Sequence, residues 1–252
     1  MGLRRLIKNY IYRKKFDVHK SVELKIKNKN ILITGANSGI GLALTKKFLD
    51  LDNGVIATYN ESKDNLLKIK NDDLKICQCD QSIIENINKL KEYIVNTPIN
   101  IIINNAGTWG GKNQIFNNID YKNFARAINI NAISILKLSE LVLECSKKNS
   151  LNTILNISTL YSSIEHNSTG KNYVYKGTKS MMNAFSKNLS IDLKREFGVN
   201  VFSVCPGSVK TKINPGGILN PENVAINLID ILENADSLNG KFVDLNKKEL
   251  TW

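Results

Sequence analysis

The feature that most constrains the fold is a glycine-rich turn between an apolar segment and a helical pattern. Residues 30–33 are mostly apolar, the turn Thr34–Gly41 carries three glycines, and apolar residues then recur at helical spacing. In a strand–turn–helix unit, Gly35 permits the tight turn, Gly39 admits a pyrophosphate to the backbone, and Gly41 allows close helix packing. The helix N-terminus would offer free N–H groups and a positive dipole end to phosphate. We therefore predict a dinucleotide site; a plain strand-to-helix connection is the alternative.

Apolar and helical segments alternate along the first half of the chain. Further strands are predicted at 54–59, 74–79 and 99–103, and helical stretches at 62–70 and 83–95. This alternation is typical of a doubly wound parallel sheet with helices on both faces. No internal repeat or Pro/Gly-rich linker divides the chain. We expect one Rossmann-type α/β domain over residues 30–252, preceded by a basic N-terminal extension, residues 1–29.

The positive charge is concentrated at the N-terminal end. The chain has a net charge of +12, and residues 1–30 hold ten Lys/Arg against only Asp17 and Glu23. Because the rest of the chain is far less basic, no nucleic-acid partner is expected. Residues 1–16 pattern as a short basic amphipathic helix, which predicts peripheral membrane contact; packing on the protein itself or on a partner subunit is the alternative. The pattern is not that of a signal peptide.

Cysteine and histidine usage argues against a metal centre. Four cysteines and two histidines occur, and Cys77 and Cys79 would share one face of a strand as small buried thiols. We expect no metal and a reducing compartment. The predicted location is therefore cytoplasmic, with peripheral contact at the inner membrane surface left open by the N-terminal extension.

A second motif supplies proton-transfer chemistry about 140 residues after the glycine turn. Tyr175 and Lys179 are four residues apart, so they would lie on one face of a helix. A free phenol has a pKa near ~10, and a nearby ammonium group favours the phenolate and lowers that pKa. Such a phenol can give a proton to a carbonyl or take one from an alcohol. An ordinary core tyrosine beside a solvated lysine is the alternative when the motif is considered alone.

With these motifs in place, the chain resembles the classical short-chain dehydrogenase/reductase family from about Lys29 to Trp252. The resemblance is carried by four segments in family order: Thr34–Gly41, Asn104–Gly107, Tyr175–Lys179 and Pro206–Thr211. Segments 167–179 and 240–252 are most similar to the C-factor and sniffer-like carbonyl reductase branch. The resemblance implies about seven parallel strands and a homodimer or homotetramer.

The resemblance also implies two further catalytic positions. The family places a hydroxyl after the fifth strand, here 153–157, to hold the substrate oxygen; the matching residue is Thr159, where serine is usual, with Ser162 as the fallback. An asparagine in the middle helix supports the proton relay, and Asn131 matches better than Asn129. The implied catalytic set is thus Tyr175, Lys179, Thr159 and Asn131.

The cofactor expected from the turn and the resemblance is NADP(H), slightly favoured over NAD(H). A carboxylate at the end of the second strand would bind a ribose 2′-OH, but Tyr59 and Asn60 stand there, and Lys63 is the nearest cation. The expected cofactor-binding residues are Gly35, Asn37, Ser38, Gly39, Ile40, Gly41, Asn60, Asp80, Asn105, Ala106, Gly107, Tyr175, Lys179, Pro206, Gly207, Val209 and Thr211.

The implied activity is NAD(P)-dependent reduction of a small-molecule carbonyl, or oxidation of the matching alcohol. Residues 212–223 are predicted to form a loop or lid over the substrate, and Trp109–Gly111 and Tyr161 to border the pocket. Two alternatives remain open. One is a membrane-surface reductase of a sugar- or lipid-linked carbonyl. The other is a cofactor-binding signalling or sensing protein with weak catalysis.

Overall fold

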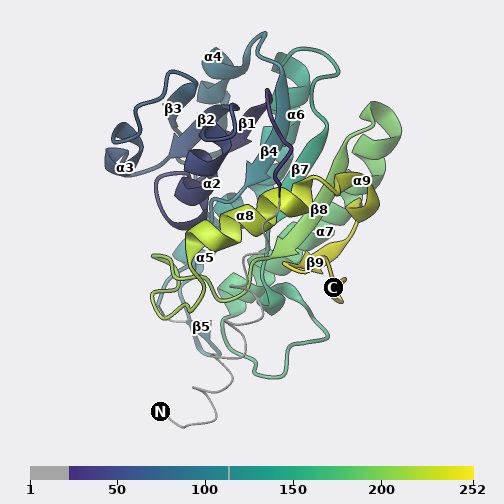
Figure 1. Ribbon diagram of the computed structural model, residues 1–252. Helices are drawn as coiled ribbons and strands as arrows, with labels where there is room; N and C mark the ends of the chain where they lie inside the picture. Colours follow the sequence, from purple (N-terminus) through teal and green to yellow (C-terminus); the bar gives the residue numbers. More distant parts are fainter. Residues whose placement is uncertain (1–22, 113) are drawn as a thin grey trace.

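A seven-stranded parallel sheet forms the centre of the computed structural model, which describes residues 23–112 and 114–252 (Figure 1). The strand order is β3-β2-β1-β4-β7-β8-β9, and every neighbouring pair is parallel. The strands are β1 (Asn30–Ile33), β2 (Gly54–Tyr59), β3 (Leu74–Gln78), β4 (Ile99–Asn104), β7 (Thr153–Ile157), β8 (Asn200–Cys205) and β9 (Phe242–Asp244). The predicted doubly wound fold is confirmed.

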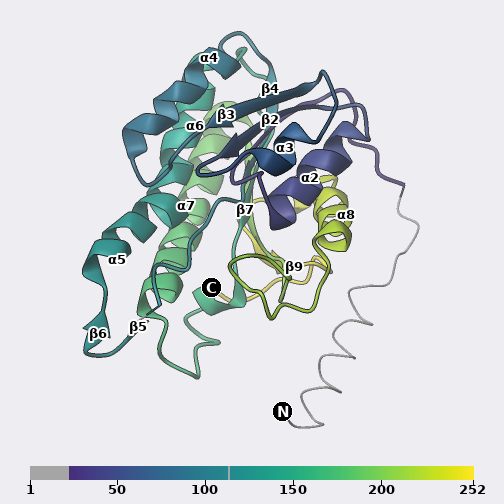
Figure 2. The same ribbon diagram turned by 90° about the vertical axis from the view of Figure 1, so that its left-hand side faces the viewer.

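Helices cover both faces of this sheet (Figure 2). One face is covered by α2 (Gly39–Leu49) and α8 (Pro221–Leu232), with the short α3 (Asp64–Leu67) and α9 (Ala235–Leu238) in the same apolar core. The other face is covered by η1 (Ile84–Leu90), α4 (Lys91–Ile94), α6 (Ser134–Cys145) and α7 (Tyr173–Phe197). The remaining elements are the hairpin β5 (Gln114–Ile115) and β6 (Asn118–Ile119), α5 (Tyr121–Ile128), the π-helical turn η2 (Asn129–Ile133) and the turn η3 (Leu160–Ser162).

Burial on both faces explains why the strands are uniformly apolar. Ile31 and Ile33 of β1 point into the core beside α2 and α8, whereas Leu32 points into the core beside α4 and α6. All three are fully buried. A strand covered on both sides must be apolar at consecutive positions, not only at alternate ones.

The order of the strands places the functional end of the sheet. The chain runs outward from β1 to β2 and β3, then returns to β4 on the other side of β1. Between β1 and β4 the crossover connections diverge to opposite sides, which leaves a crevice beyond the carboxyl ends of these strands. The glycine turn after β1 and the Asn104–Gly107 segment after β4 meet at this crevice.

The boundaries of four predicted elements are wrong; one of these elements is β4, which ends at Asn104, one residue after the expected end. The expected helix 62–70 is reduced to α3, because an Asn71 side chain accepts from the Asp73 N–H and turns the chain towards β3. The stretch 83–95 is a 3₁₀ helix followed by α4, in a sequence containing Asn86 and Asn88, which are weak helix formers. Strand β3 also ends at Gln78, one residue before the expected end.

Across the described residues, no helix combines the length and apolarity that crossing a bilayer requires. Residues 1–16, for which membrane contact was predicted, lie outside the described part of the chain.

Candidate active site

The glycine turn is held against the end of β4 by reciprocal hydrogen bonds. The Thr34 hydroxyl accepts from the backbone N–H groups of Asn105 (3.0 Å) and Ala106 (2.9 Å). The Asn105 amide donates back to the carbonyl oxygens of Thr34 (2.9 Å) and Gly35 (3.1 Å). Two segments some 70 residues apart therefore form one rigid corner.

Two glycines of the turn are required by close contacts. Gly35 has φ +61°, and a Cβ there would lie 2.8 Å from the Ala106 Cα. A Cβ on Gly41 would lie 2.5 Å from both the Asn105 amide nitrogen and the Gly35 carbonyl oxygen. Gly41 lies behind the turn and packs the helix on it, so among the expected cofactor residues its role is structural.

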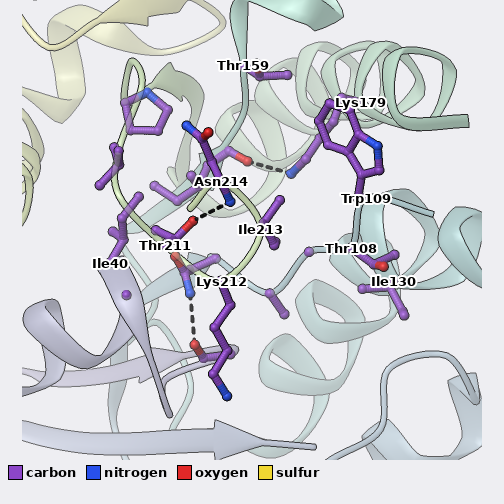
Figure 3. A pocket seen from close by; sticks show the side chains of 18 of the residues that line it. Ile40, Thr108, Trp109, Ile130, Thr159, Lys179, Thr211, Lys212, Ile213 and Asn214 are labelled. Atoms are coloured by element: carbon purple, nitrogen blue, oxygen red, sulfur yellow. Dashed lines mark hydrogen bonds between the residues drawn. The ribbon is translucent and has the colours of Figure 1, made fainter. Parts of the chain in front are cut away.

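The N-terminus of α2 faces a cavity of about 1140 Å³; Ile40, from the first turn of this helix, is labelled in Figure 3. Asn37, Ser38, Gly39 and Ile40 line it at this end. Ser38 makes no side-chain cap, and the first turn of α2 contains no acidic residue, so within the described structure its backbone N–H groups and positive dipole end are not neutralised. A cavity of this size with this terminus at one end fits a dinucleotide bound through its pyrophosphate.

The part of the cavity beyond the ends of β2 and β3 contains a carboxylate that the sequence interpretation missed. Asn60 and Asp80 line the cavity as expected, and so does the exposed Glu61. Asp80 is 3.8 Å from the Arg126 guanidinium and accepts from the Ser82 N–H at 2.9 Å. Glu61 lies two residues after the end of β2, whereas the cofactor argument considered only Tyr59 and Asn60. Extending that argument by one residue into the loop would have identified Glu61.

Tyr175 and Lys179 lie on one face of α7 and both line the other end of the cavity. Lys179 Nζ donates to the Ile157 carbonyl oxygen at 2.7 Å, and burial lowers the pKa of Lys179 to about 8. Burial raises the pKa of Tyr175 to about 12, helped by Cys205 and opposed by a hydrogen bond with Thr159. The expectation that Lys179 lowers the phenol pKa is not met: burial is the largest cause of the shift, and Lys179, whose ammonium donates to the Ile157 carbonyl, is not among its causes. The phenol is therefore protonated at neutral pH and can donate a proton.

Thr159 is the hydroxyl that the cavity presents to Tyr175. Its side chain hydrogen-bonds with Tyr175 and accepts weakly from the Tyr161 N–H at 3.3 Å. Ser158 also lines the cavity, but its hydroxyl bonds Asn183 (2.8 Å) and Ser162 (3.1 Å). The fallback Ser162 is buried in that same network and does not line the cavity.

Asn131 holds the loop after β4 from a π-helical turn between α5 and α6. Its side-chain oxygen accepts from the Thr108 N–H (2.8 Å), and its amide donates to the Thr108 carbonyl (2.9 Å) and the Thr178 hydroxyl (2.9 Å). It does not line the cavity itself. The alternative, Asn129, donates to the Ser82 carbonyl instead. Single π-helical turns within α-helices are often found at functional sites.

The segment after β8 closes the cavity over the glycine turn. Pro206, Gly207, Val209 and Thr211 all line it, and the Thr211 side chain lies where a Cβ on Gly39 would be. The expected lid is shorter than 212–223, because α8 begins at Pro221. Figure 3 shows Lys212, Ile213 and Asn214 of this loop among the residues that line the cavity.

The remaining expected pocket residues are also in place. Asn105, Ala106 and Gly107 line the middle of the cavity, and Trp109, Gly110 and Tyr161 line the end nearest Tyr175. Gly111 does not. Among the described residues, no group of three or more His, Cys, Asp or Glu could hold a metal ion.

The family profile described as short chain dehydrogenase matches residues 29–217 of this sequence. This chain belongs to the short-chain dehydrogenase family. It is thus an oxidoreductase of that family, with the Rossmann-like fold described above. The match covers the glycine turn, the Asn104–Gly107 segment and the Tyr175–Lys179 pair.

Individual relatives of the family are similar at modest identity. The NADPH-dependent 1-acyldihydroxyacetone phosphate reductase of Schizosaccharomyces pombe is 29% identical over 188 residues, which is 73% of this chain and 61% of that relative's length. The C-signal protein of Myxococcus xanthus is 30% identical over 62% of this chain and 93% of its own length. The carbonyl reductase Sniffer of D. melanogaster has the same fold, with a TM-score of 0.80 and 24% identity over 90% of this chain and 100% of that chain.

Proposed function

We propose that this protein reduces the carbonyl group of a small molecule, or oxidises the matching alcohol, with NADP(H) as its preferred cofactor. The observation that carries the proposal is one cavity with an uncapped helix N-terminus at one end and a hydrogen-bonded Tyr175–Thr159 pair at the other. A nicotinamide dinucleotide bound there would supply or accept the hydride. The family membership and the carbonyl reductases among its structural relatives support the same reaction.

The residues of the chain would divide the proton chemistry among them. Thr159 and Tyr175 would both hydrogen-bond the carbonyl oxygen, which fixes its orientation and polarises it. Tyr175, protonated because its pKa is about 12, would donate the proton as charge develops on that oxygen. Lys179 would restore the proton, since its pKa of about 8 lies near neutral pH. Asn131 would hold the loop at Thr108 that borders this end of the cavity.

The preference for NADP(H) rests on the charges at the adenosine end. Neutral Tyr59 and Asn60 stand where a carboxylate would bind the ribose 2′-OH, and Lys212, on the loop after β8, adds a cation to the cavity lining that has no ion pair to any described residue. Glu61 acts in the opposite direction by repelling a 2′-phosphate. We therefore expect Glu61→Gln to tighten NADPH binding and leave NADH binding nearly unchanged. The S. pombe relative, named as NADPH-dependent, agrees with this choice.

The proposal is tested by cofactor binding and a carbonyl panel with two matched tyrosine variants. Tyr175→Phe removes the proton donor, whereas Tyr173→Phe removes an exposed phenol from the start of the same helix. We expect both variants to bind NADPH, Tyr175→Phe to lose at least ~100-fold in kcat, and Tyr173→Phe to keep its activity.

Two results would overturn the proposal. If neither NADPH nor NADH binds, the cavity is not a dinucleotide site. If wild type and Tyr175→Phe bind cofactor but are equally inert, a signalling or sensing role replaces the enzymatic one. The same preparations test the proposed homodimer or homotetramer by light scattering.

A carbonyl carried by a lipid is the second candidate substrate. The S. pombe relative is named for an acylated dihydroxyacetone phosphate, and the basic residues within 1–16 would favour an anionic membrane. Reduction of a lipid-linked ketone presented in vesicles, against the same ketone with a short acyl chain, would identify this role.

A further inference from the structure

Three aromatic rings meet at the reactive end of the cavity. Trp109 stacks on Tyr175 with ring centroids 4.4 Å apart and planes inclined by 27°. Tyr161 meets both rings edge-on, with centroids 6.5 Å from each. All three line the cavity, and Figure 3 shows Trp109 at the same end as Lys179 and Thr159. Tyr175 has a chemical role, but the other two rings are not explained by proton transfer.

The backbone around Trp109 is fixed on both sides. The preceding residue, Thr108, is held by two hydrogen bonds to Asn131. The carbonyl oxygen of Trp109 accepts from the Gln114 side chain at 2.6 Å, and the oxygen of that same side chain accepts from the Tyr175 N–H at 2.8 Å. Gln114 is buried. One amide group therefore ties Trp109 to the first turn of the helix that carries Tyr175.

The two glycines after Trp109 make this placement specific. Gly110 and Gly111 have φ of +83° and +102°, a conformation that other residues rarely adopt. A Cβ on Gly110 would lie 2.3 Å from a Val174 methyl group. The chain can turn sharply here and pack on α7, which leaves the indole directed at Tyr175.

Tyr161 is supported from a different element. It lies in η3, next to Thr159, and it is 47% exposed. The buried Lys176 places its ammonium 5.5 Å from the ring centroid and bonds Asn167, Thr169 and Gly170 in the loop that follows. An anchored cation thus lies over the Tyr161 ring, and Tyr161 also lines the cavity.

We infer that Trp109 and Tyr161 form a specificity wall that selects carbonyl substrates carrying a flat, conjugated ring. Leu160, Ile213 and Leu250 add apolar side chains to the lining of the same cavity. A planar ring whose carbonyl oxygen reaches Thr159 and Tyr175 can stack closely on the indole, whereas a puckered saturated ring of the same size makes a looser contact. Aromatic stacking discriminates beyond burial of apolar area, typically by about three- to tenfold. This inference rests on the proposed carbonyl reduction and names its substrate class.

The test compares two ketones that differ mainly in the flatness of the ring, acetophenone and cyclohexyl methyl ketone. Each is assayed with NADPH in wild type, Trp109→Leu and Trp109→Phe, and the quantity of interest is the ratio of the two kcat/KM values. The intrinsic reactivities of the ketones cancel when variants are compared with wild type. We expect the ratio to fall about three- to tenfold in Trp109→Leu and to stay within about twofold in Trp109→Phe. An unchanged ratio in Trp109→Leu would overturn the inference and leave the proposed reaction standing.

A second measurement does not depend on turnover. The chain has two tryptophans, and Trp252 is stacked on Phe242 and does not line the cavity. In Trp252→Phe, Trp109 is the sole indole, so its fluorescence reports contact with the ketone, with and without NADP⁺ present. Trp109→Phe, which keeps only Trp252, controls for collisional quenching. We expect saturable quenching by acetophenone in Trp252→Phe alone. Quenching of the same size in both variants would overturn the inference, even if wild type reduced neither ketone. Absence of turnover with any ketone would count against the proposed function and not against this inference.

Discussion

Replacing Thr159 by valine is the sharpest test of the chemistry at the reactive end of the cavity. Valine keeps the shape and branching of threonine but removes the hydroxyl that hydrogen-bonds with Tyr175. If this hydroxyl also holds the substrate oxygen, its loss resembles the loss of one oxyanion-hole donor, about 10²–10³ in kcat, or roughly 2.7–4 kcal/mol. Thr159→Ser keeps the donor and should stay within about threefold of wild type.

The same substitution has a small, separable effect on stability. Valine removes the long bond from the Tyr161 N–H at 3.3 Å and the hydrogen bond with Tyr175, so it should cost about 1–2 kcal/mol. For a domain of this size that lowers Tm by a few degrees at most. An activity loss far larger than this would therefore not be a folding defect.

The pH profile provides a further readout. The Thr159 hydrogen bond lowers the pKa of Tyr175 against the effect of burial, so its removal should raise that pKa further. Carbonyl reduction needs the protonated phenol and should keep its profile at neutral pH, whereas alcohol oxidation should move to higher pH. Steady-state kinetics from pH 6 to 10 and thermal unfolding complete the assay. A Thr159→Val enzyme within threefold of wild type would refute the role given to this hydroxyl.

Three other predictions concern the charge, the loop and the N-terminal extension. Burial holds the pKa of Lys179 at about 8, below its usual value, so the unfolded chain binds more protons than the folded one between about pH 8 and 10, and the free energy of unfolding should rise with pH in that window. Lys179→Met should be inactive, yet more stable than wild type at pH 7 by roughly 1–3 kcal/mol, as measured by denaturant unfolding. A Cβ on Gly217 would lie 2.2 Å from the Val209 carbonyl group, whereas one on Gly216 would meet nothing within 4 Å; Gly217→Ala should lose about 1–3 kcal/mol and weaken NADPH binding, and Gly216→Ala should match wild type in both measurements. The full chain should pellet with anionic vesicles more than a truncation starting at Lys29, and equal pelleting would remove the membrane proposal.

The sequence was sufficient for the parts of the fold that depend on local patterns. The apolar runs at 30–33, 54–59 and 153–157 gave strand boundaries that agree with β1, β2 and β7, because strands buried on both faces leave a continuous apolar signal. The glycine turn was equally informative, since two of its glycines, Gly35 and Gly41, lie too close to neighbouring backbone atoms to carry a Cβ. The irregular 83–95 stretch was not predictable in this way, because a helix-like apolar spacing does not distinguish a 3₁₀ helix from an α-helix.

Parts of the site that depend on tertiary contacts could not be predicted. Burial in the folded protein raises the pKa of Tyr175, and so does Cys205 at the end of β8, 30 residues away in sequence, whereas the neighbouring Lys179 has no part in the shift. Gln114 gave no signal at all: a lone glutamine in a short hairpin links Trp109 to Tyr175 only once the chain is folded. Choosing between Asn129 and Asn131 by their apolar surroundings did favour the buried residue, but their partners came from the structure alone.

The π-helical turn η2 lies between two helices with different roles: α5, which faces the cavity, and α6, which packs on the sheet. Before it, α5 buries only Ala127 and turns Asn123 and Arg126 towards the cavity; after it, α6 packs its apolar face on the sheet. Each residue of a regular helix advances the chain by about 100°. Deleting one residue between Asn129 and Ile133 would therefore rotate α5 away from the cavity, while α6 stayed packed in the core. A single deletion could thus reorient the cavity wall formed by α5, or remove it, and leave the sheet and α6 folded.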